Sequence, residues 1–228
     1  MTRNLFLMTG VLSSVLYVLM NILIPIQWPE YNIYSQTVSE LSALGAPTRS
    51  VWVATGFVYT ILIIAFGFGI RMSAGDSGLL RMSGKFIWIY GFVSLLWPFA
   101  PMHLRGEGYS TTDILHIALG MITLLCMILA MIFGAMALKV GFRIYTIISM
   151  AAFLFFGALT GMDAPRIKEN LSTPFVGLWE RINISAFLIW VAVFAIVMIT
   201  KASIHRRGFS SEKKRNEARK VQTLHEMN

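Results

Sequence analysis

Charged residues are scarce in this sequence. They make up 13% of the 228 residues, whereas hydrophobic residues make up 56% and the mean hydropathy is +0.68. Soluble globular domains carry about 25% charged residues, so this composition excludes an ordinary soluble domain. Regular alternation of apolar and polar residues is also missing, which excludes a membrane-spanning β-barrel. The remaining class is a chain of membrane-spanning helices.

Cysteine is nearly absent. The single residue, Cys126, lies in the middle of an apolar run, so the chain forms no internal disulfide. Aromatic–basic modules of the kind that bind nucleic acid are also absent, although the net charge is +8. We therefore expect no nucleic-acid partner and expect membrane lipids as partners; the sequence does not fix an oligomeric state.

Long apolar runs are abundant. A helix needs about 20 apolar residues to cross a hydrocarbon core of about 30 Å. We predict an all-α, polytopic membrane helix bundle in residues 1–200, followed by a basic tail in residues 201–228. The first run is about twice as long as a signal-peptide core and no cleavage site follows it, so we interpret it as a retained helix. The six predicted transmembrane helices are 5–26, 51–71, 84–100, 113–138, 143–161 and 174–200.

The basic residues are divided unequally between the two sides of the predicted membrane. Because basic loops stay in the cytoplasm, this bias predicts cytoplasmic N- and C-termini in a multi-pass protein of the plasma membrane. The tail could also lie on anionic headgroups, or it could be a solvated segment that only sets topology. Of the 19 basic residues, the predicted outer side holds only Arg49, Arg105, Arg166, Lys168 and Arg181.

The first outer connection reads "YNIYSQTVSELSALGAPTRS". Ser35 can cap a short helix, which Gly45 ends and Pro47 prevents from resuming. Glu40 would lie near the middle of this interfacial helix. The segment is either a plain connector or a lid over the helix ends.

Two histidines and an aspartate lie near the start of the fourth span. Ser110 and Asp113 fit a capping box, which explains Asp113 without any function. His116 shares a helix face with Asp113 and lies about one turn deeper, so Asp113 could orient its imidazole. His103 follows a proline-rich break. These residues are candidates for either a structural or a functional role.

Glu180 and Arg181 lie about two turns into the last span. Neighbours in sequence point in different directions on a helix, so each needs its own partner. Arg181 can extend to the headgroups, whereas Glu180 is short and costs several kcal/mol at the membrane boundary unless it is paired or neutral. Asp163 closes the fifth span. Gly157 and Gly161 let a neighbouring helix approach closely, which would bring Asp163 toward the other polar residues of the outer side.

The outer motifs together resemble a known family. "YSQTVSELSALGAP", "FAPMH", "DILHIALG" and "GLWERI" occur in the order typical of an uncharacterised prokaryotic family of six-helix membrane proteins, domain of unknown function 998, over about residues 5–200. "SELSALGAP" and the fourth helix are also distantly similar to the damage-regulated autophagy modulator family, which implies work on lipids. The nearer resemblance implies no reaction, but it makes the residues within its motifs stronger candidates for a functional site. These residues are Glu40, His103, Asp113, His116, Glu180 and Arg181.

Two functions follow from these residues. The first is a polar pocket at the extracytoplasmic ends of helices 3–6 that binds a lipid headgroup or small amphiphile, with Arg181 meeting a phosphate or carboxylate.

The second is a membrane hydrolase acting on a lipid, with catalytic candidates Asp113, His116 and Glu180. It would use a divalent metal held by His103, Asp113 and His116, or a serine such as Ser39. No zinc-site spacing such as HExxH is present. A haem held by two histidines is a weaker alternative, because only His116 lies clearly inside a span. A small-solute transporter is another alternative, but ionisable residues near the midplane are missing.

Overall fold

The computed structural model describes residues 2–108 and 110–226, with side chains described as far as Lys201. All elements in this part of the chain are helical, and six helices are long and apolar enough to cross a membrane. This confirms the predicted all-α fold with six transmembrane helices. The helices are α1 (Thr2–Leu23), η1 (Pro25–Gln27), η2 (Val38–Ser42), α2 (Arg49–Met72), α3 (Gly78–Ser94), η3 (Trp97–Phe99), α4 (Thr111–Ala137), α5 (Val140–Lys168) and α6 (Val176–Glu226).

The six long helices form a ring. Each packs against its neighbours in the chain, and α6 packs against α1 to close the circle. Large side chains such as Phe66, Trp190 and Phe194 are fully buried inside it. The outward faces are apolar, as on α5, where Ile148 and Phe155 are 65% and 60% exposed. Such a surface suits hydrocarbon rather than water.

Glycine allows α2 and α3 to approach closely. A Cβ at Gly67 would lie 2.8 Å from the backbone nitrogen of Trp88 and 3.0 Å from the carbonyl oxygen of Gly84. Any side chain at position 67 would therefore push the two backbones apart, which is the usual reason for small residues at helix contacts in membranes.

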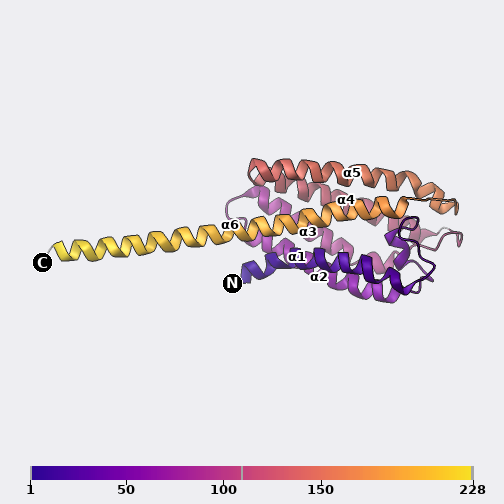
Figure 1. Cartoon of the computed structure of the whole chain (residues 1–228), viewed down its shortest axis with the longest axis horizontal. Helices are drawn as coiled ribbons and strands as arrows, with labels where there is room; N and C mark the ends of the chain where they lie inside the picture. Colours follow the sequence, from indigo (N-terminus) through magenta and orange to yellow (C-terminus); the bar gives the residue numbers. More distant parts are fainter. Residues whose placement is uncertain (1, 109, 227–228) are drawn as a thin grey trace.

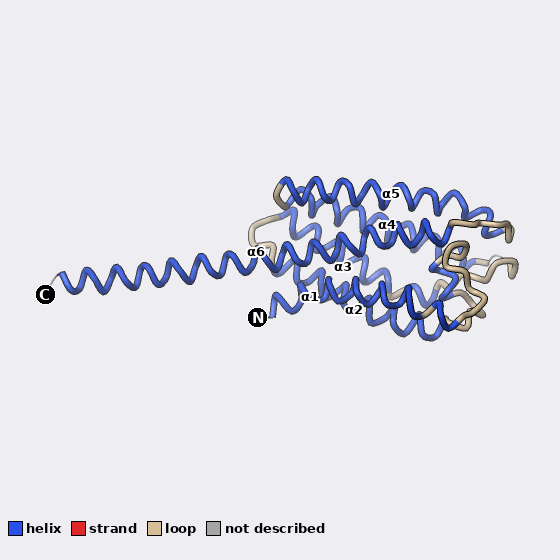
Figure 2. Tube along the Cα trace, in the orientation of Figure 1, coloured by secondary structure: helices blue, strands red, loops and turns tan. Residues whose placement is uncertain are grey.

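The connections gather unevenly at the two ends of the bundle (Figure 1). We call the end with the connections 24–48, 95–108 and 169–175 the loop end. The N-terminus lies at the other end, and α6 continues past the bundle there as one helix, with only its part Val176–Lys201 qualifying as a membrane span. Figure 2 shows that most of the non-helical chain lies at the loop end.

The helix boundaries differ from the predicted spans by a few residues, except for the third and fifth helices and the end of the sixth, which continues to Glu226 instead of ending near residue 200. The third helix begins at Gly78 and ends at Ser94. It does not continue because Pro98 and Pro101 cannot supply backbone donors, and η3, which contains Pro98, completes the crossing. The fifth runs on to Lys168, with Pro165 in its last turn. The side chains of the tail lie outside the described residues, so its contact with headgroups stays a prediction, as does the cytoplasmic location of both termini.

Candidate functional site

A folded segment covers the loop end of the bundle. We call residues 31–46, which contain η2, the lid. Thr37 caps η2: its hydroxyl accepts from the amide of Glu40 at 3.3 Å, and a Glu40 carboxylate oxygen accepts from the amide of Thr37 at 2.6 Å. From the sequence we predicted that Ser35 caps a helix here, and this prediction was wrong, because the cap is Thr37. The carbonyl of Ser35 accepts a hydrogen bond from Arg105 instead.

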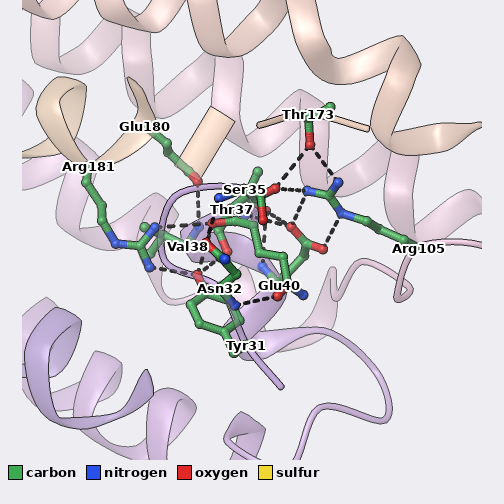
Figure 3. Close-up of polar contacts among 11 residues, drawn as sticks. Tyr31, Asn32, Ser35, Thr37, Val38, Glu40, Arg105, Thr173, Glu180 and Arg181 are labelled. Atoms are coloured by element: carbon green, nitrogen blue, oxygen red, sulfur yellow. Dashed lines mark hydrogen bonds and ion pairs between the residues drawn. The ribbon is translucent and has the colours of Figure 1, made fainter. Parts of the chain in front are cut away.

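A buried ion pair holds the lid from one side. Glu40 is 1% exposed, and its carboxylate accepts from Arg105 through Nε at 2.6 Å and Nη2 at 3.0 Å. Arg105 also donates to the hydroxyl of Thr173 at 2.6 Å, which lies just before α6. These bonds, drawn in Figure 3, join three segments that are far apart in the sequence. A bidentate pair with further hydrogen bonds to the same guanidinium is the arrangement in which a buried charge is tolerated.

The start of α6 holds the lid from the other side. Glu180 accepts from the backbone amide of Val38 at 2.5 Å and from the Ser39 hydroxyl at 3.4 Å. Arg181 donates to the carbonyl of Ile33 at 2.8 Å and to the hydroxyl of Tyr31 at 2.7 Å. As predicted from their adjacency, the two side chains point in different directions, and both contact the lid (Figure 3).

The lid also packs directly on the backbone of α6. The amide of Gly177 donates to the carbonyl of Tyr34 at 2.8 Å. A Cβ on Gly177 would collide with the carbonyl oxygens of Gln36 and Ile33, so only glycine fits at this position. Burial raises the pKa of Tyr31 above its usual value, although the Arg181 cation beside it acts in the opposite direction.

Asp113 is used differently from the prediction. It completes the expected capping box, accepting from the amide of Ser110 at 2.9 Å. It does not orient His116; instead it binds His103, with the backbone amide at 2.8 Å and Nδ1 at 2.7 Å. The N-terminal position of Asp113 explains this, because its carboxylate turns back toward the chain that precedes the helix.

His116 is held by the backbone and by a ring. Its Nδ1 lies 2.8 Å from the carbonyl oxygen of Ala100, and Trp97 packs against the imidazole with ring centroids 4.6 Å apart. A carbonyl can only accept, so Nδ1 carries the proton and Nε2 of the neutral ring is an acceptor. Nε2 is buried without a hydrogen-bond partner among the described residues.

A cavity of about 360 Å³ lies beneath the lid. Each of the six long helices contributes to its wall, and Val38, Ser39 and Ser42 of the lid contribute to its roof. It lies beside the place where the 17-residue α3 gives way to η3, whereas α2 and α4 have 24 and 27 residues. One lining residue from each helix in turn is Tyr17, Tyr59, Tyr90, Met127, Phe153 and Phe187.

The polar groups of the cavity wall lie nearest the loop end. Arg49 begins α2, while His116 and Glu180 lie in the second turns of α4 and α6. Deeper, apolar side chains dominate, and Met127 lies about 16 Å further along α4 than His116. The hydroxyls of Tyr59 and Tyr90, 2.9 Å apart, form one hydrogen bond with each other at this depth. The cavity therefore has a polar end and a largely apolar remainder.

The cavity reaches the outer surface of the helix ring. Phe57 and Ile117 line it although they are 53% and 52% exposed. In addition, α4 and α5 contact each other much less than the other neighbouring helices do, although only Leu138 and Lys139 separate them. With increasing distance from that connection, α4 and α5 therefore lie farther apart, on the side of the bundle that hydrocarbon would contact.

The predicted site residues divide into three groups. His116 and Glu180 line the cavity, whereas Glu40 and Arg181 hold the lid and Asp113 and His103 pair beside it. Asp163 lies apart, 3.8 Å from Arg166 on the same helix. In residues 2–108 and 110–201, no three His, Cys, Asp or Glu side chains are grouped as metal ligands, so a metal at His103, Asp113 and His116 stays a prediction.

Sequence reasoning missed Arg49, Arg105, Tyr59 and Tyr90. The two arginines were noted only as outer basic residues, and the tyrosines lie in apolar spans without a motif. A signal was nevertheless present for the tyrosines, because a tyrosine hydroxyl within an apolar span needs a partner and usually finds it in the bundle interior. Arg49 and Arg105 lie outside the predicted spans, so this signal does not apply to them.

Comparison with known proteins identifies the family. Residues 11–197 match the family described as "Protein of unknown function (DUF998)". No curated protein and no solved structure matches the chain. The fainter likeness to the damage-regulated autophagy modulator proteins therefore stays a prediction.

Proposed function

The chain is an integral membrane protein of the family DUF998, whose function is unknown, and from the cavity we propose that it binds an amphiphile beneath its lid. The polar end of the ligand would lie near Glu180, His116 and Arg49, and its apolar part would extend between the helices. The observation that carries the proposal is the cavity itself, with its polar groups at one end and apolar groups beyond them.

The size and composition of the cavity support this proposal. Small-molecule sites in proteins measure about 300–1,000 Å³ and combine an apolar lining with a few placed polar groups. At about 360 Å³ this cavity lies in that range. If the cavity held no ligand, Nε2 of His116 would stay buried without a hydrogen-bond partner in the described part of the chain. Unsatisfied buried polar atoms are rare in native proteins.

The access route favours a ligand that comes from the bilayer. On the loop side the lid is fixed through Arg105, Glu180, Arg181 and Gly177. On the lipid side, exposed residues such as Ile117 already belong to the cavity wall. A water-soluble solute would have to break the lid bonds, whereas an amphiphile can enter sideways from the membrane.

We further propose that the loop end faces the outside of the plasma membrane. Only five of the 19 basic residues lie on the connections and helix termini of this end, as the positive-inside rule expects for an external face. The hydrolase and the transporter remain alternatives, and no contact in the described residues favours either.

Photolabelling tests the proposed function. The full chain, in nanodiscs of phosphatidylcholine, is exposed to an uncharged diazirine-bearing monoacylglycerol, and labelled peptides are identified by mass spectrometry. We expect label within the α4 and α6 segments that line the cavity, and we expect excess unlabelled monoacylglycerol to remove it.

Glycine variants supply the decisive comparison. Gly120→Leu should fill the cavity, because a Cβ there meets only Trp97 at 3.9 Å, and Gly56→Leu should do the same from α2. The matched control is Gly161→Leu, which has open space around it on α5 and does not line the cavity. Cavity labelling should fall to background in the first two variants and persist in the control. Equal labelling in all three would refute the proposal.

A further inference from the structure

Arg49 is a cation in the cavity wall whose partners are all neutral. Its guanidinium donates to the carbonyl of Ser42 at the end of η2 and to the carbonyl of Pro98 in η3 at 3.3 Å. A guanidinium has five N–H donors, so these bonds leave donors for another partner. Arg49 therefore bridges the lid and η3 and still presents charge to the cavity.

The other arginines at this end are engaged differently. Arg105 has the carboxylate of Glu40 at 2.6 Å and Arg166 has that of Asp163 at 3.8 Å. No carboxylate in the described residues lies within ion-pair distance of Arg49. Arg181 also lacks a carboxylate, but it is not part of this cavity wall and instead contacts Tyr31 and lid carbonyls.

The cavity does contain a carboxylate, but the lid uses it. One oxygen of Glu180 accepts from the Val38 amide at 2.5 Å and the other from the Ser39 hydroxyl at 3.4 Å. Arg49 is part-buried, and its carbonyl partners are neutral, so an anion that contacts its guanidinium would add charge-assisted hydrogen bonds that the protein itself does not supply. Among the described residues that line this cavity, the cation without an oppositely charged partner is therefore Arg49.

We infer that the amphiphile in this cavity is anionic and that its carboxylate or phosphate contacts the guanidinium of Arg49. The inference rests on the proposed function, since it names the class of ligand for the same cavity. Both kinds of anion accept paired hydrogen bonds from a guanidinium, so they share the recognition and differ in origin: a carboxylate indicates a free fatty acid, and a phosphate indicates a phospholipid derivative.

The test measures competition against the same photolabel. Unlabelled dodecanoate, dodecyl phosphate, dodecyltrimethylammonium and monolauroylglycerol compete at matched concentrations in the nanodisc. At least one anion should compete at a concentration at least about tenfold lower than the neutral and cationic compounds, as charge-assisted contacts allow. Which anion competes better decides between the two sources.

Variants assign the preference to one side chain. Arg49→Gln should lose the preference for anions, Arg49→Lys should keep most of it, and Arg166→Gln, a matched change outside the cavity wall at a 51% exposed side chain, should leave it intact. Equal competition by all four compounds in the parent protein would overturn the inference, as would an Arg49→Gln protein that still labels and still prefers anions. Absence of cavity labelling in the parent would instead refute the proposed function.

Discussion

Replacing Arg105 with leucine should destabilise the protein strongly, because it removes the partner of a buried carboxylate. Glu40 is 1% exposed and the Arg105 side chain is 15% exposed. Removing one member of a buried ion pair costs about 3–5 kcal/mol, since the other charge is left uncompensated. One oxygen of Glu40 keeps the amide and hydroxyl of Thr37, at 2.6 and 2.9 Å. We therefore expect a loss near the lower end, about 3 kcal/mol.

The matched control is Arg166→Leu. Arg166 also pairs with a carboxylate, that of Asp163, but at 3.8 Å and with 51% of its side chain exposed. Exposed pairs contribute about 0–1 kcal/mol. Unfolding in detergent micelles, followed by circular dichroism, measures both variants against the parent.

A double variant isolates the charge. Glu40→Leu with Arg105→Leu removes both ions and should recover part of the loss, because apolar replacement of a whole buried pair is often tolerated. If Arg105→Leu costs no more than Arg166→Leu, the ion pair does not hold the lid and the reasoning is wrong.

Two further predictions concern the other lid contacts. Glu180→Leu should leave the Val38 amide buried without an acceptor, costing about 1–3 kcal/mol and speeding hydrogen exchange in the lid peptide, whereas Glu180→Gln retains an acceptor oxygen and should exchange like the parent. Equal exchange in both variants would contradict the role given to Glu180. Because the pKa of Tyr31 is raised, the folded residue keeps its proton above pH 10 while the unfolded one loses it, so stability should fall as the pH rises through about 10. Tyr31→Phe should flatten that fall, and unfolding measured from pH 8 to 11 in both proteins gives the comparison.

The fold could be predicted from the sequence because hydrocarbon imposes a strong pattern. Six long apolar runs can only be helices in a membrane, and several boundaries fall near a cap or a proline, such as Ser77 before α3 and Ser110 before α4. The end of α3 at Ser94 was harder, because the apolar run continues unbroken through Trp97. Hydropathy alone does not register a change from an α-helix to a 3₁₀ turn.

The candidate site could be predicted only as a set of residues near one end. Glu180 was expected to need a partner, and it has one, but that partner is the backbone amide of Val38. The partners of Arg181 are likewise mostly carbonyls. Backbone groups occur at every position, so no sequence pattern can single them out. The pairing of Arg105 with Glu40 crosses 65 positions, and composition does not indicate which acid an arginine will meet.

The long-range bonds of the lid have a consequence for biosynthesis. Val38 and Glu180 are separated by 142 positions, and at about 5–20 residues per second a ribosome needs about 7–28 s to make that stretch. During this interval the lid of the nascent chain lacks its bonds to α6. Arg105, the partner of Glu40, is synthesised well before Glu180, the acceptor for the Val38 amide. Closure of the ring by α6 and fastening of the lid are thus one late event, and a chain released early would leave its interior open to surrounding lipid.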